Sequence, residues 1–452
     1  MSLRDLLNTS SGKTGLPGGE PEATLPKVRK VDAEAIRLKS EIHLDLLKKF
    51  DLSVMERISA EELRQRLAEF VDESLNERRV NMNANQRKAL VASIQNEVMG
   101  LGPLEPLLAD NTISDILVNG HDTVYVERRG KLEVTNVRFT DEEHLLRIIE
   151  KIVSRIGRRV DESSPMVDAR LPDGSRVNAI IPPLALDGSA LSIRKFSAVP
   201  LAVDDLINLG AMTQEMAYLL AAMVRSGLNI LISGGTGSGK TTMLNMLSSF
   251  IPDDERIVTI EDAAELRLQQ PHVVRLETRP PNIEGLGEIS QRDLFRNTLR
   301  MRPDRIVVGE IRGAEVLDLL QAMNTGHEGS MGTIHANTAR DALTRLENMV
   351  GIAGLNIPVM PLRQQIVSAL SAIVQVSRLT DGKRKLVGIL EITGMEGEMI
   401  STQEIFKFIQ TGVAPDGAVQ GHFKATGIRP KFADTLAAKG LPLPEYLFDP
   451  HR

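Results

Sequence analysis

The sequence predicts an α/β protein whose C-terminal part is a doubly wound, mostly parallel sheet, preceded by an α+β domain and a small helical bundle. Three observations in the 452 residues lead to this prediction. From residue 206 onward, strand-like apolar runs alternate with helix-like segments, as in parallel sheets with helical crossovers. Residues 101–196 show short strand signals and turns around one long helical stretch. Residues 36–100 show helical periodicity in three segments.

The same patterns predict the domain boundaries. The first residues are rich in Ser, Gly, Pro and Lys and are expected to be disordered. The C-terminal domain is expected to end in a helical or irregular tail from about residue 396, because Gly and Pro interrupt it. The expected order is a disordered segment at 1–35, a three-helix bundle at 36–100, an α+β domain at 101–196, a linker at 197–205 and the C-terminal domain at 206–452.

Composition excludes several classes of protein. Apolar residues make up 42% and charged residues 25% of the chain, which is ordinary for a soluble domain. The net charge of −6 and the scarcity of aromatic residues argue against a nucleic-acid binder. The chain has no cysteine, which suits the cytoplasm and excludes disulfides and thiolate metal sites. No apolar run is long enough to cross a bilayer, so we expect membrane association only through a partner.

Residues 234–241 read GGTGSGKT and match the phosphate-loop pattern G-x-x-x-x-G-K-[ST]. A buried strand is predicted at 228–233 and a helix from 242, so a flexible Gly/Ser linker is the weaker interpretation. Glycines let backbone N–H groups turn toward phosphate oxygens. Lys240 is expected to reach the β- and γ-phosphates, and the Thr241 hydroxyl to ligate Mg²⁺. The predicted nucleotide-binding residues of the loop are Gly234, Gly235, Thr236, Gly237, Ser238, Gly239, Lys240, Thr241 and Thr242.

Three further strands are predicted to end in polar residues at the sheet edge where open α/β sheets bind ligands. Glu261 follows a β-branched run and is expected to position the attacking water or the waters on Mg²⁺. The next residue, Asp262, is open to a second interpretation as a helix N-cap. Glu310 ends another apolar strand, and Gly309 precedes it where many P-loop ATPases carry an Asp linked to Mg²⁺. His335 ends a third strand and is expected to sense the γ-phosphate.

Because Gly309 cannot ligate a metal, Mg²⁺ is expected to depend on Thr241, phosphate and water, with Glu310 and Glu261 acting through water. Glu310 is alternatively the residue that orients the attacking water. Arginines are also available to stabilise phosphoryl charge, often from another domain or subunit. Arg176 and Arg194, in the α+β domain, are the candidates, although a surface arginine is by default only a solvated charge.

In this order and spacing, the signatures resemble those of the secretion superfamily (GspE/PilT-like) ATPases, which serve type II and type IV secretion, type IV pili and archaella. Residues 261–262 match the family's Asp box, 304–310 its atypical Walker B element with a Gly-Glu ending, and 333–337 its His box. The segments 169–178 and 191–195 resemble its N-terminal domain, in which arginines reach nucleotide phosphates. The resemblance implies a RecA-like P-loop ATPase core, a PAS-like α+β domain, ATP/ADP and Mg²⁺ as cofactors, and a homo-hexamer.

Within the family the chain is most similar to the CpaF-type (TadA) motor of tight-adherence (Tad/Flp) pili, because a helical module precedes the α+β domain. The absence of cysteine argues against branches with a cysteine-rich metal motif. The type IV secretion branch is the nearest competitor. The resemblance implies a cytoplasmic enzyme, peripheral at the inner membrane, that moves platform proteins to assemble or retract a pilus. A nucleotide-controlled scaffold with little hydrolysis and a nucleic-acid motor are the alternatives.

Overall fold

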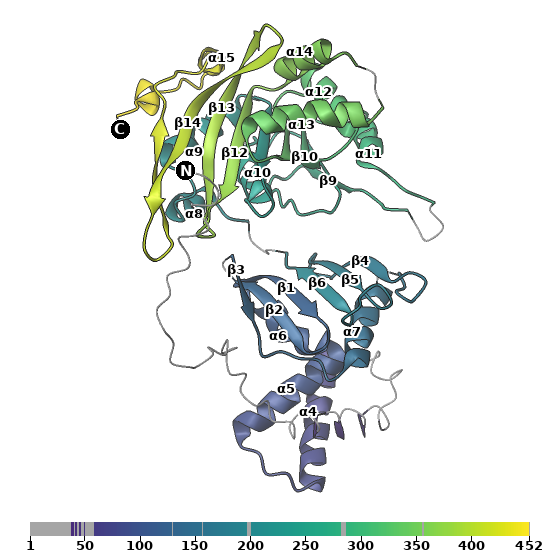
Figure 1. Ribbon diagram of the computed structural model, residues 1–452. Coiled ribbons are helices and arrows are strands. Elements are labelled where there is room, and N and C mark those ends of the chain that lie inside the picture. The colour runs from purple at the N-terminus through teal and green to yellow at the C-terminus, as the bar shows by residue number, and fades with distance from the viewer. Residues whose placement is uncertain are drawn as a thin grey trace, which may run out of the picture.

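In the computed structural model, the described residues are individual positions between 38 and 49, and then 58–128, 130–155, 157–196, 200–281, 286–354 and 357–451. The predicted disordered segment at 1–35 lies outside the described residues. The described chain contains two sheets, one above the other in Figure 1, with a helical module at the far end of the smaller sheet.

The helical module is built on two capped helices, α4 (Ala60–Glu77) and α5 (Ala84–Met99). The Ser59 hydroxyl accepts the Glu62 N–H at 3.1 Å and so satisfies one free donor at the start of α4. Ile42 and Leu46 are helical and fully buried in the same apolar cluster as the two helices. Helical residues from before α4 therefore pack with α4 and α5, as the periodicity predicts.

The smaller sheet has six strands, and each neighbouring pair is antiparallel. Helix α7 (Glu142–Ser154) covers one face through an apolar stripe that includes Leu145, Ile149 and Ile152. Short helices η2 (Gly102–Leu104) and α6 (Glu105–Ala109) precede the first strand. In spatial order the strands are β3 (Lys131–Val134), β2 (Thr123–Arg128), β1 (Ile113–Asn119), β6 (Ala190–Arg194), β5 (Arg176–Ile180) and β4 (Met166–Arg170).

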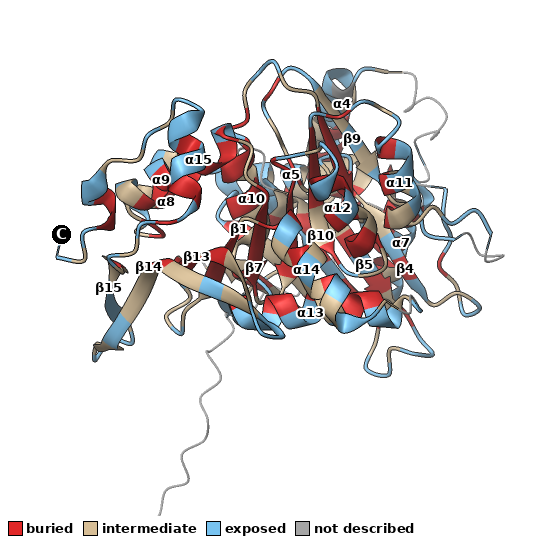
Figure 2. Ribbon diagram, turned by 90° about the horizontal axis from the view of Figure 1, so that it is seen from above, coloured by how far each residue is buried: buried red, intermediate tan, exposed pale blue. Residues whose placement is uncertain are grey.

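The larger sheet begins with a parallel part, which confirms the doubly wound α/β prediction. Its inner strands are buried between two layers of helices, as the red strands in Figure 2 show. Helices α9 (Gln214–Arg225) and α10 (Lys240–Ser248) cover one face, and α12 (Glu315–Asn324), α13 (Ala339–Ile352) and α14 (Val359–Ala369) the other. The parallel strands, in spatial order, are β12 (Ala372–Arg378), β7 (Ile230–Gly234), β11 (Met331–His335), β10 (Arg305–Ile311), β8 (Ile257–Glu261) and β9 (Val273–Glu277).

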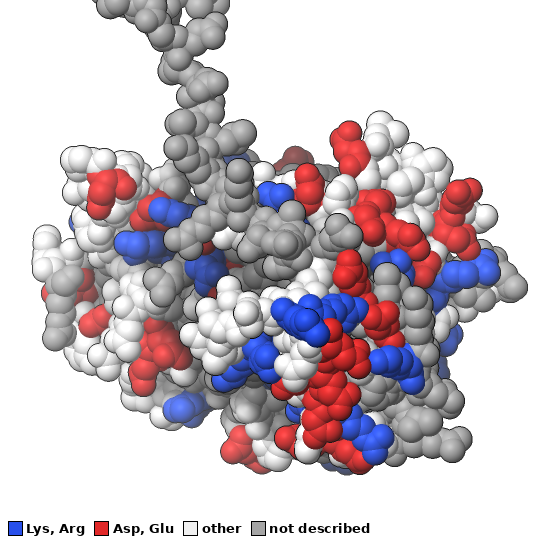
Figure 3. All heavy atoms as spheres, turned by 90° about the horizontal axis from the view of Figure 1, so that it is seen from below, with Lys and Arg blue, Asp and Glu red and all other residues white. Residues whose placement is uncertain are grey.

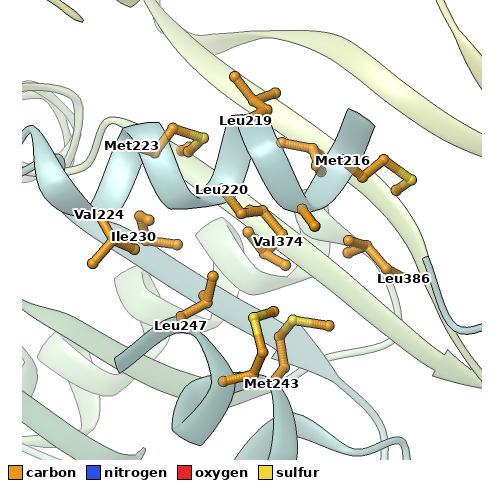
Figure 4. Close-up of a cluster of buried hydrophobic side chains, with 14 of the residues drawn as sticks. Met216, Leu219, Leu220, Met223, Val224, Ile230, Met243, Leu247, Val374 and Leu386 are labelled. Carbon is orange, nitrogen blue, oxygen red and sulfur yellow. The ribbon is translucent and has the colours of Figure 1, made fainter. Parts of the chain in front are cut away.

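Packing on the first face fixes the strand that leads into the phosphate loop. Figure 4 shows Leu220 and Val224 of α9 lying over Ile230 and Val374, and Met243 of α10 belongs to the same apolar cluster. All five residues are buried to within a few per cent of their surface. At roughly 1.5–3 kcal/mol for each fully buried side chain, this layer is a major source of stability for the sheet edge that carries the site.

The prediction of a helical or irregular tail from about residue 396 is wrong for most of this segment. Strands β13 (Arg384–Glu396), β14 (Met399–Val413) and β15 (Val419–Ala425) form an antiparallel extension of the sheet beyond β12. These strands are long but mostly half-exposed, and register shifts interrupt each pair. Their apolar alternation is therefore weak in the sequence. The expected tail does contain helix, namely α15 (Phe432–Ala438), and η3 (Glu445–Phe448) follows it.

The predicted linker at 197–205 is shorter than expected, because α8 (Val203–Asn208) begins inside it. The Asp205 carboxylate accepts the Ala202 N–H at 2.8 Å, and this contact closes the start of the helix. Among the described residues, no helix combines the length and the apolar character that a membrane span requires.

Candidate active site

The phosphate loop connects a fully buried strand to a half-buried helix start. Strand β7 is buried at all five positions, and α10 begins at Lys240 with Gly239 as its N-cap. Gly237 and Gly239 have φ values of 68° and 98°, a left-handed conformation that glycine adopts without strain. A Cβ on Gly234 would lie 2.4 Å from Ser238 Oγ, so a side chain would not fit there. The loop and the first turn of α10 together form an anion-binding cradle.

Lys240 and Thr241 of the motif both donate hydrogen bonds to oxygen atoms of the protein, which phosphate oxygens could replace. Lys240 Nζ donates to the carbonyl oxygens of Gly234 and Gly235, both at 3.0 Å, which folds the side chain over the loop. Burial lowers the pKa of Lys240, while the nearby Glu310 opposes this shift. The Thr241 hydroxyl lies 3.3 Å from Glu265 Oε2. An ammonium and a hydroxyl are thus held at the mouth of the cradle.

Glu261, at the end of β8, is a buried carboxylate with one oxygen satisfied. Only 2% of the surface of Glu261 is exposed to solvent. Oε2 accepts the backbone N–H groups of Glu265 and Leu266 at 2.7 and 2.9 Å. Oε1 is buried and has no hydrogen-bond partner among the described residues. Burial raises the pKa of Glu261 above its usual range, although the two backbone donors oppose this.

The helix N-cap interpretation of Asp262 is wrong. The residues after it form an irregular segment rather than a helix, and it is Glu261 that accepts the backbone donors there. The Asp262 carboxylate instead lies 3.1 Å from Arg312 Nη1. Asp262 is therefore part of an ion-pair network at the cleft.

Glu310 leaves the sheet at an irregular point in β10. Val308 pairs with Gly332 and Ile311 with Ile334, so three steps on β10 match two on β11. Such a bulge bends the strand and redirects the side chain next to it. Glu310 Oε2 lies 2.6 Å from Arg312 Nη2, which in turn contacts Asp262. The bulge brings the Glu310 carboxylate into the network beside the cradle.

Gly309 is required by the close approach of β8. A Cβ on Gly309 would lie 2.9 Å from Glu261 Cγ, closer than real Cβ contacts allow. The Gly309 carbonyl also accepts the Thr333 hydroxyl at 2.6 Å. An Asp at this position would therefore displace Glu261, which explains in physical terms why the strand ends in Gly-Glu here.

His335 is level with Gly234, because β11 pairs in parallel with β7. Burial, followed by the positive charges of Lys240 and Arg345, lowers the pKa of His335. The imidazole is therefore neutral at neutral pH, with one ring nitrogen able to donate and the other to accept. The strand order thus places His335 beside the start of the phosphate loop.

The α+β domain supplies arginines to the same region. Arg176 Nη1 lies 2.8 Å from Glu265 Oε1, and the other Glu265 oxygen faces Thr241. Glu265 thus joins the phosphate loop to the preceding domain. Arg194 pairs instead with Asp115 of its own domain at 3.2 Å, and its side chain is 58% exposed.

The phosphate loop, the strand-end residues and the arginines of the α+β domain line a cleft of about 620 Å³ between the two sheets. Gly234 and Gly235 contribute the structure of the loop but do not line the cleft. The cleft walls include most of the predicted residues, namely Thr236, Gly237, Ser238, Gly239, Lys240, Thr241, Thr242, Glu261, Glu310, His335, Arg176 and Arg194.

Sequence reasoning missed several charged residues at the cleft, among them Glu265, Arg312, Arg378 and Arg384. Arg312 follows Glu310 by two residues, and this spacing could have suggested a pair on one face of a strand. Arg378 and Arg384 come from the hairpin between β12 and β13. Their approach to the loop depends on β12 lying next to β7, which no local pattern reveals.

The residues fit a magnesium ion held mainly by phosphate and water. Among the residues that the structure describes, no cluster of three or more His, Cys, Asp or Glu side chains could hold a metal alone. The Thr241 hydroxyl and the unpartnered Oε1 of Glu261 are hard oxygen donors at the cleft. Mg²⁺ prefers such oxygens, keeps several waters and is often completed by substrate phosphates.

The buried charge of Glu261 leads to a stability prediction. Because folding raises its pKa, its contribution to stability is greatest when the carboxyl is protonated and is lost as pH rises above the ordinary value of 4.5. Glu261→Gln cannot ionise, so its thermal midpoint should gain on the wild type as pH rises. Unfolding curves in metal-free buffer across this range measure the difference, with the exposed Glu61→Gln as control. A difference in thermal midpoint between Glu261→Gln and the wild type that stays constant with pH would contradict the prediction.

A phosphate loop, strand-end carboxylates and an α/β sheet define a P-loop nucleotide hydrolase. The family model "Type II/IV secretion system protein" matches residues 97–418. The chain belongs to this family of ATPases and is an ATP-hydrolysing traffic ATPase of type II/IV secretion systems.

Two individual relatives agree with this assignment, and one solved structure is reported beside them. A putative conjugal transfer protein of Mycobacterium tuberculosis is 41% identical over 312 residues, which cover 68% of this chain and 88% of the relative. The conjugal transfer protein TrbB of Rhizobium radiobacter is 34% identical and covers 64% and 86%. The solved VirB11 ATPase of the Brucella suis type IV secretion system, in complex with sulphate, is 28% identical, covers 64% and 94%, and has a TM-score of 0.34.

Proposed function

We propose that this chain is a hexameric motor that hydrolyses ATP to drive a membrane-embedded pilus or secretion machine. The observation that carries the proposal is the ion pair between Arg176 and Glu265, which ties the α+β domain to the phosphate loop through Thr241. A nucleotide bound in this cleft contacts both domains. Its hydrolysis therefore changes the forces between them, which is the requirement for a motor.

In the proposed ATP hydrolysis, each residue of the cleft has its own role. Lys240 and the N–H groups of the loop hold the β- and γ-phosphates. Glu310 orients the attacking water or accepts its proton, and Arg312 holds the carboxylate in place at 2.6 Å. Neutral His335 donates a hydrogen bond to the γ-phosphate and registers its loss. Glu261 is positioned to bind waters in the outer shell of the metal. When bound, Mg²⁺ neutralises charge that develops on the phosphates.

Arg176 and Arg194 complete the proposed site from the α+β domain. Arg176 already faces the loop through Glu265, so phosphate can compete directly for its guanidinium. Arg194 is exposed at the rim and bound to Asp115, which suits contact with a nucleotide only after a shift of the domain or with a neighbouring subunit. In a ring, the neighbouring subunit would cover the open side of the cleft.

We infer a tight-adherence pilus as the machine, in which the motor would act on inner-membrane platform proteins from the cytoplasmic side. The helical module of α4 and α5 before the α+β domain and the lack of cysteine favour this branch. A second candidate is conjugation or type IV secretion, favoured by the 41% identity to a putative conjugal transfer protein. Deleting the gene and then counting surface pili and transferred substrate separates the two.

A direct action on nucleic acid is not part of the proposal. The chain has a net charge of −6, three tyrosines and no tryptophan, so it lacks the basic and aromatic surface typical of single-strand binders. On the face in Figure 3, the coloured acidic and basic side chains alternate and form no continuous basic patch. We expect a titration of the protein with DNA to show no binding, even at low salt.

The central test is steady-state phosphate release by the purified chain with Mg²⁺ and ATP, measured alongside its mass by light scattering. A motor is expected to assemble with ATP and to release phosphate continuously. Release at the rate of buffer alone, from a chain that binds ATP and assembles, would instead identify a nucleotide-controlled scaffold. A monomer under all nucleotide conditions would contradict the hexamer.

A further inference from the structure

Arg378, the last residue of β12, lies where the phosphate loop meets the α+β domain. Because β12 runs parallel to β7, Val376 is level with Gly234. Arg378 therefore stands two residues beyond the point where the phosphate loop begins. The hairpin that follows it extends toward the smaller sheet and ends near β3 in Figure 1. A long side chain at this position can reach both parts of the molecule.

The Arg378 guanidinium contacts both. Nη1 lies 3.4 Å from the position that a Cβ on Gly237 would occupy, so it rests against the phosphate loop. Nη2 donates to the carbonyl oxygen of Gly130, in the turn between β2 and β3. Nη2 also lies 3.7 Å from Oε1 of Glu127, which lines the cleft. One planar cation thus connects the loop to the α+β domain.

The contact between the two turns is small and has space beside it. Gly130 has a φ of 80°, and a Cβ there would lie 3.2 Å from Arg378 Nη2 and 3.4 Å from the Gly382 carbonyl oxygen. A second cavity, of about 410 Å³, lies along Arg378 and is lined by both turns, including Lys131 and Asp381. The turns can therefore shift relative to each other without breaking a packed core.

Arg384 begins β13, at the other end of the same hairpin, and contacts the same loop. Its Nε donates to the Gly237 carbonyl oxygen at 2.9 Å. Its Cδ lies 3.4 Å from the position of a Cβ on Gly239. Arg384 thus supports the loop through its backbone, which makes it a matched comparison for Arg378 within one hairpin.

We propose that Arg378 is a positioning residue that couples occupancy of the phosphate loop to the position of the α+β domain. The inference rests on the proposed ATP-driven cycle. Phosphate oxygens in the cleft attract the guanidinium and compete with Glu127 for it, because both are anions within reach of one cation. The cation shifts toward the phosphates when they are bound, and the turn at Gly130 follows it. Release of phosphate returns the cation to Glu127.

The absence of cysteine allows a direct measurement. Ser163→Cys in the α+β domain and Gln321→Cys on α12 are exposed positions for a pair of thiol-specific spin labels. The distance between the labels is measured with and without Mg²⁺ and a non-hydrolysable ATP analogue at saturating concentration. Nucleotide affinity is measured on the same samples. The variants are Arg378→Gln, Arg384→Gln and, as a surface control, Arg429→Gln, whose side chain pairs with the exposed Asp434.

Arg378→Gln is expected to bind the analogue but to lose the distance change, and to lower kcat about tenfold with a smaller change in KM, within the usual range of coupling free energies. Arg384→Gln should weaken binding yet keep the distance change at saturation. Should Arg378→Gln not fold, Glu127→Gln and Arg378→Lys test the same link from either side. The inference would be overturned if Arg378→Gln, or both Glu127→Gln and Arg378→Lys, showed the same distance change as the wild type. It would also be overturned if a wild type that hydrolyses ATP showed no distance change. A wild type that does not hydrolyse ATP would refute the proposed function instead.

Discussion

Glu310→Gln is expected to abolish nearly all ATP hydrolysis while leaving nucleotide binding intact. Glutamine keeps the size and one oxygen of the side chain but cannot accept a proton or hold the negative charge that faces Arg312 at 2.6 Å. Loss of a positioned general base typically costs about 10²–10⁴-fold in rate. The measurement is kcat from phosphate release, together with Kd for ATP from calorimetry.

The control for Glu310→Gln is Glu61→Gln, because the Glu61 side chain is 92% exposed on α4, far from the cleft. Trapping of ATP, seen as slow exchange of a labelled nucleotide, would accompany the loss of turnover. A Glu310→Gln protein that hydrolyses ATP at the wild-type rate would refute the role of this carboxylate and direct attention to Glu261.

Lys240→Ala is expected to remove nucleotide binding itself. In the structure the ammonium lines the cleft and donates two hydrogen bonds to the carbonyl oxygens of Gly234 and Gly235. Hydrogen bonds to charged groups contribute about 1.5–3 kcal/mol each, so affinity should fall by at least one to two orders of magnitude. Titration with a fluorescent ATP analogue gives the change in Kd directly.

Lys88→Ala is the matched control, because Lys88 is an exposed lysine on α5. The carbonyl oxygens of Gly234 and Gly235 would lose their Lys240 donor in Lys240→Ala, so its thermal midpoint should also be compared with that of the wild type. Unchanged ATP affinity in a folded Lys240→Ala protein would mean that the loop does not bind the phosphates.

Local sequence signals were sufficient for the cradle and for the strand ends. Strand, glycine loop and helix are consecutive in the chain, so 234–241 could be recognised without knowing the strand order. Glu261, Glu310 and His335 each end a strand with a clear apolar run, and parallel strands present their carboxyl ends at one edge. Their presence around one cleft therefore followed from fold class alone.

Residues that depend on neighbours in space could not be found in this way. Arg378 and Arg384 reach the loop only because β12 lies beside β7, and Arg176 meets Glu265 only because two domains face each other. Arg194 has the same local setting as Arg176 but pairs with its own domain. The antiparallel extension was missed for a different reason, since its half-exposed strands carry little hydrophobic contrast.

The bulge in β10 makes the site depend on the number of residues between Val308 and Ile311 as well as on their identity. Three steps on β10 match two on β11, and the additional residue sets the direction in which Glu310 leaves the sheet. Deleting one residue there would restore regular pairing and turn the carboxylate elsewhere, even though Glu310 itself is retained. Tolerance of this segment to insertion and deletion should accordingly be far lower than its tolerance to substitution among apolar residues.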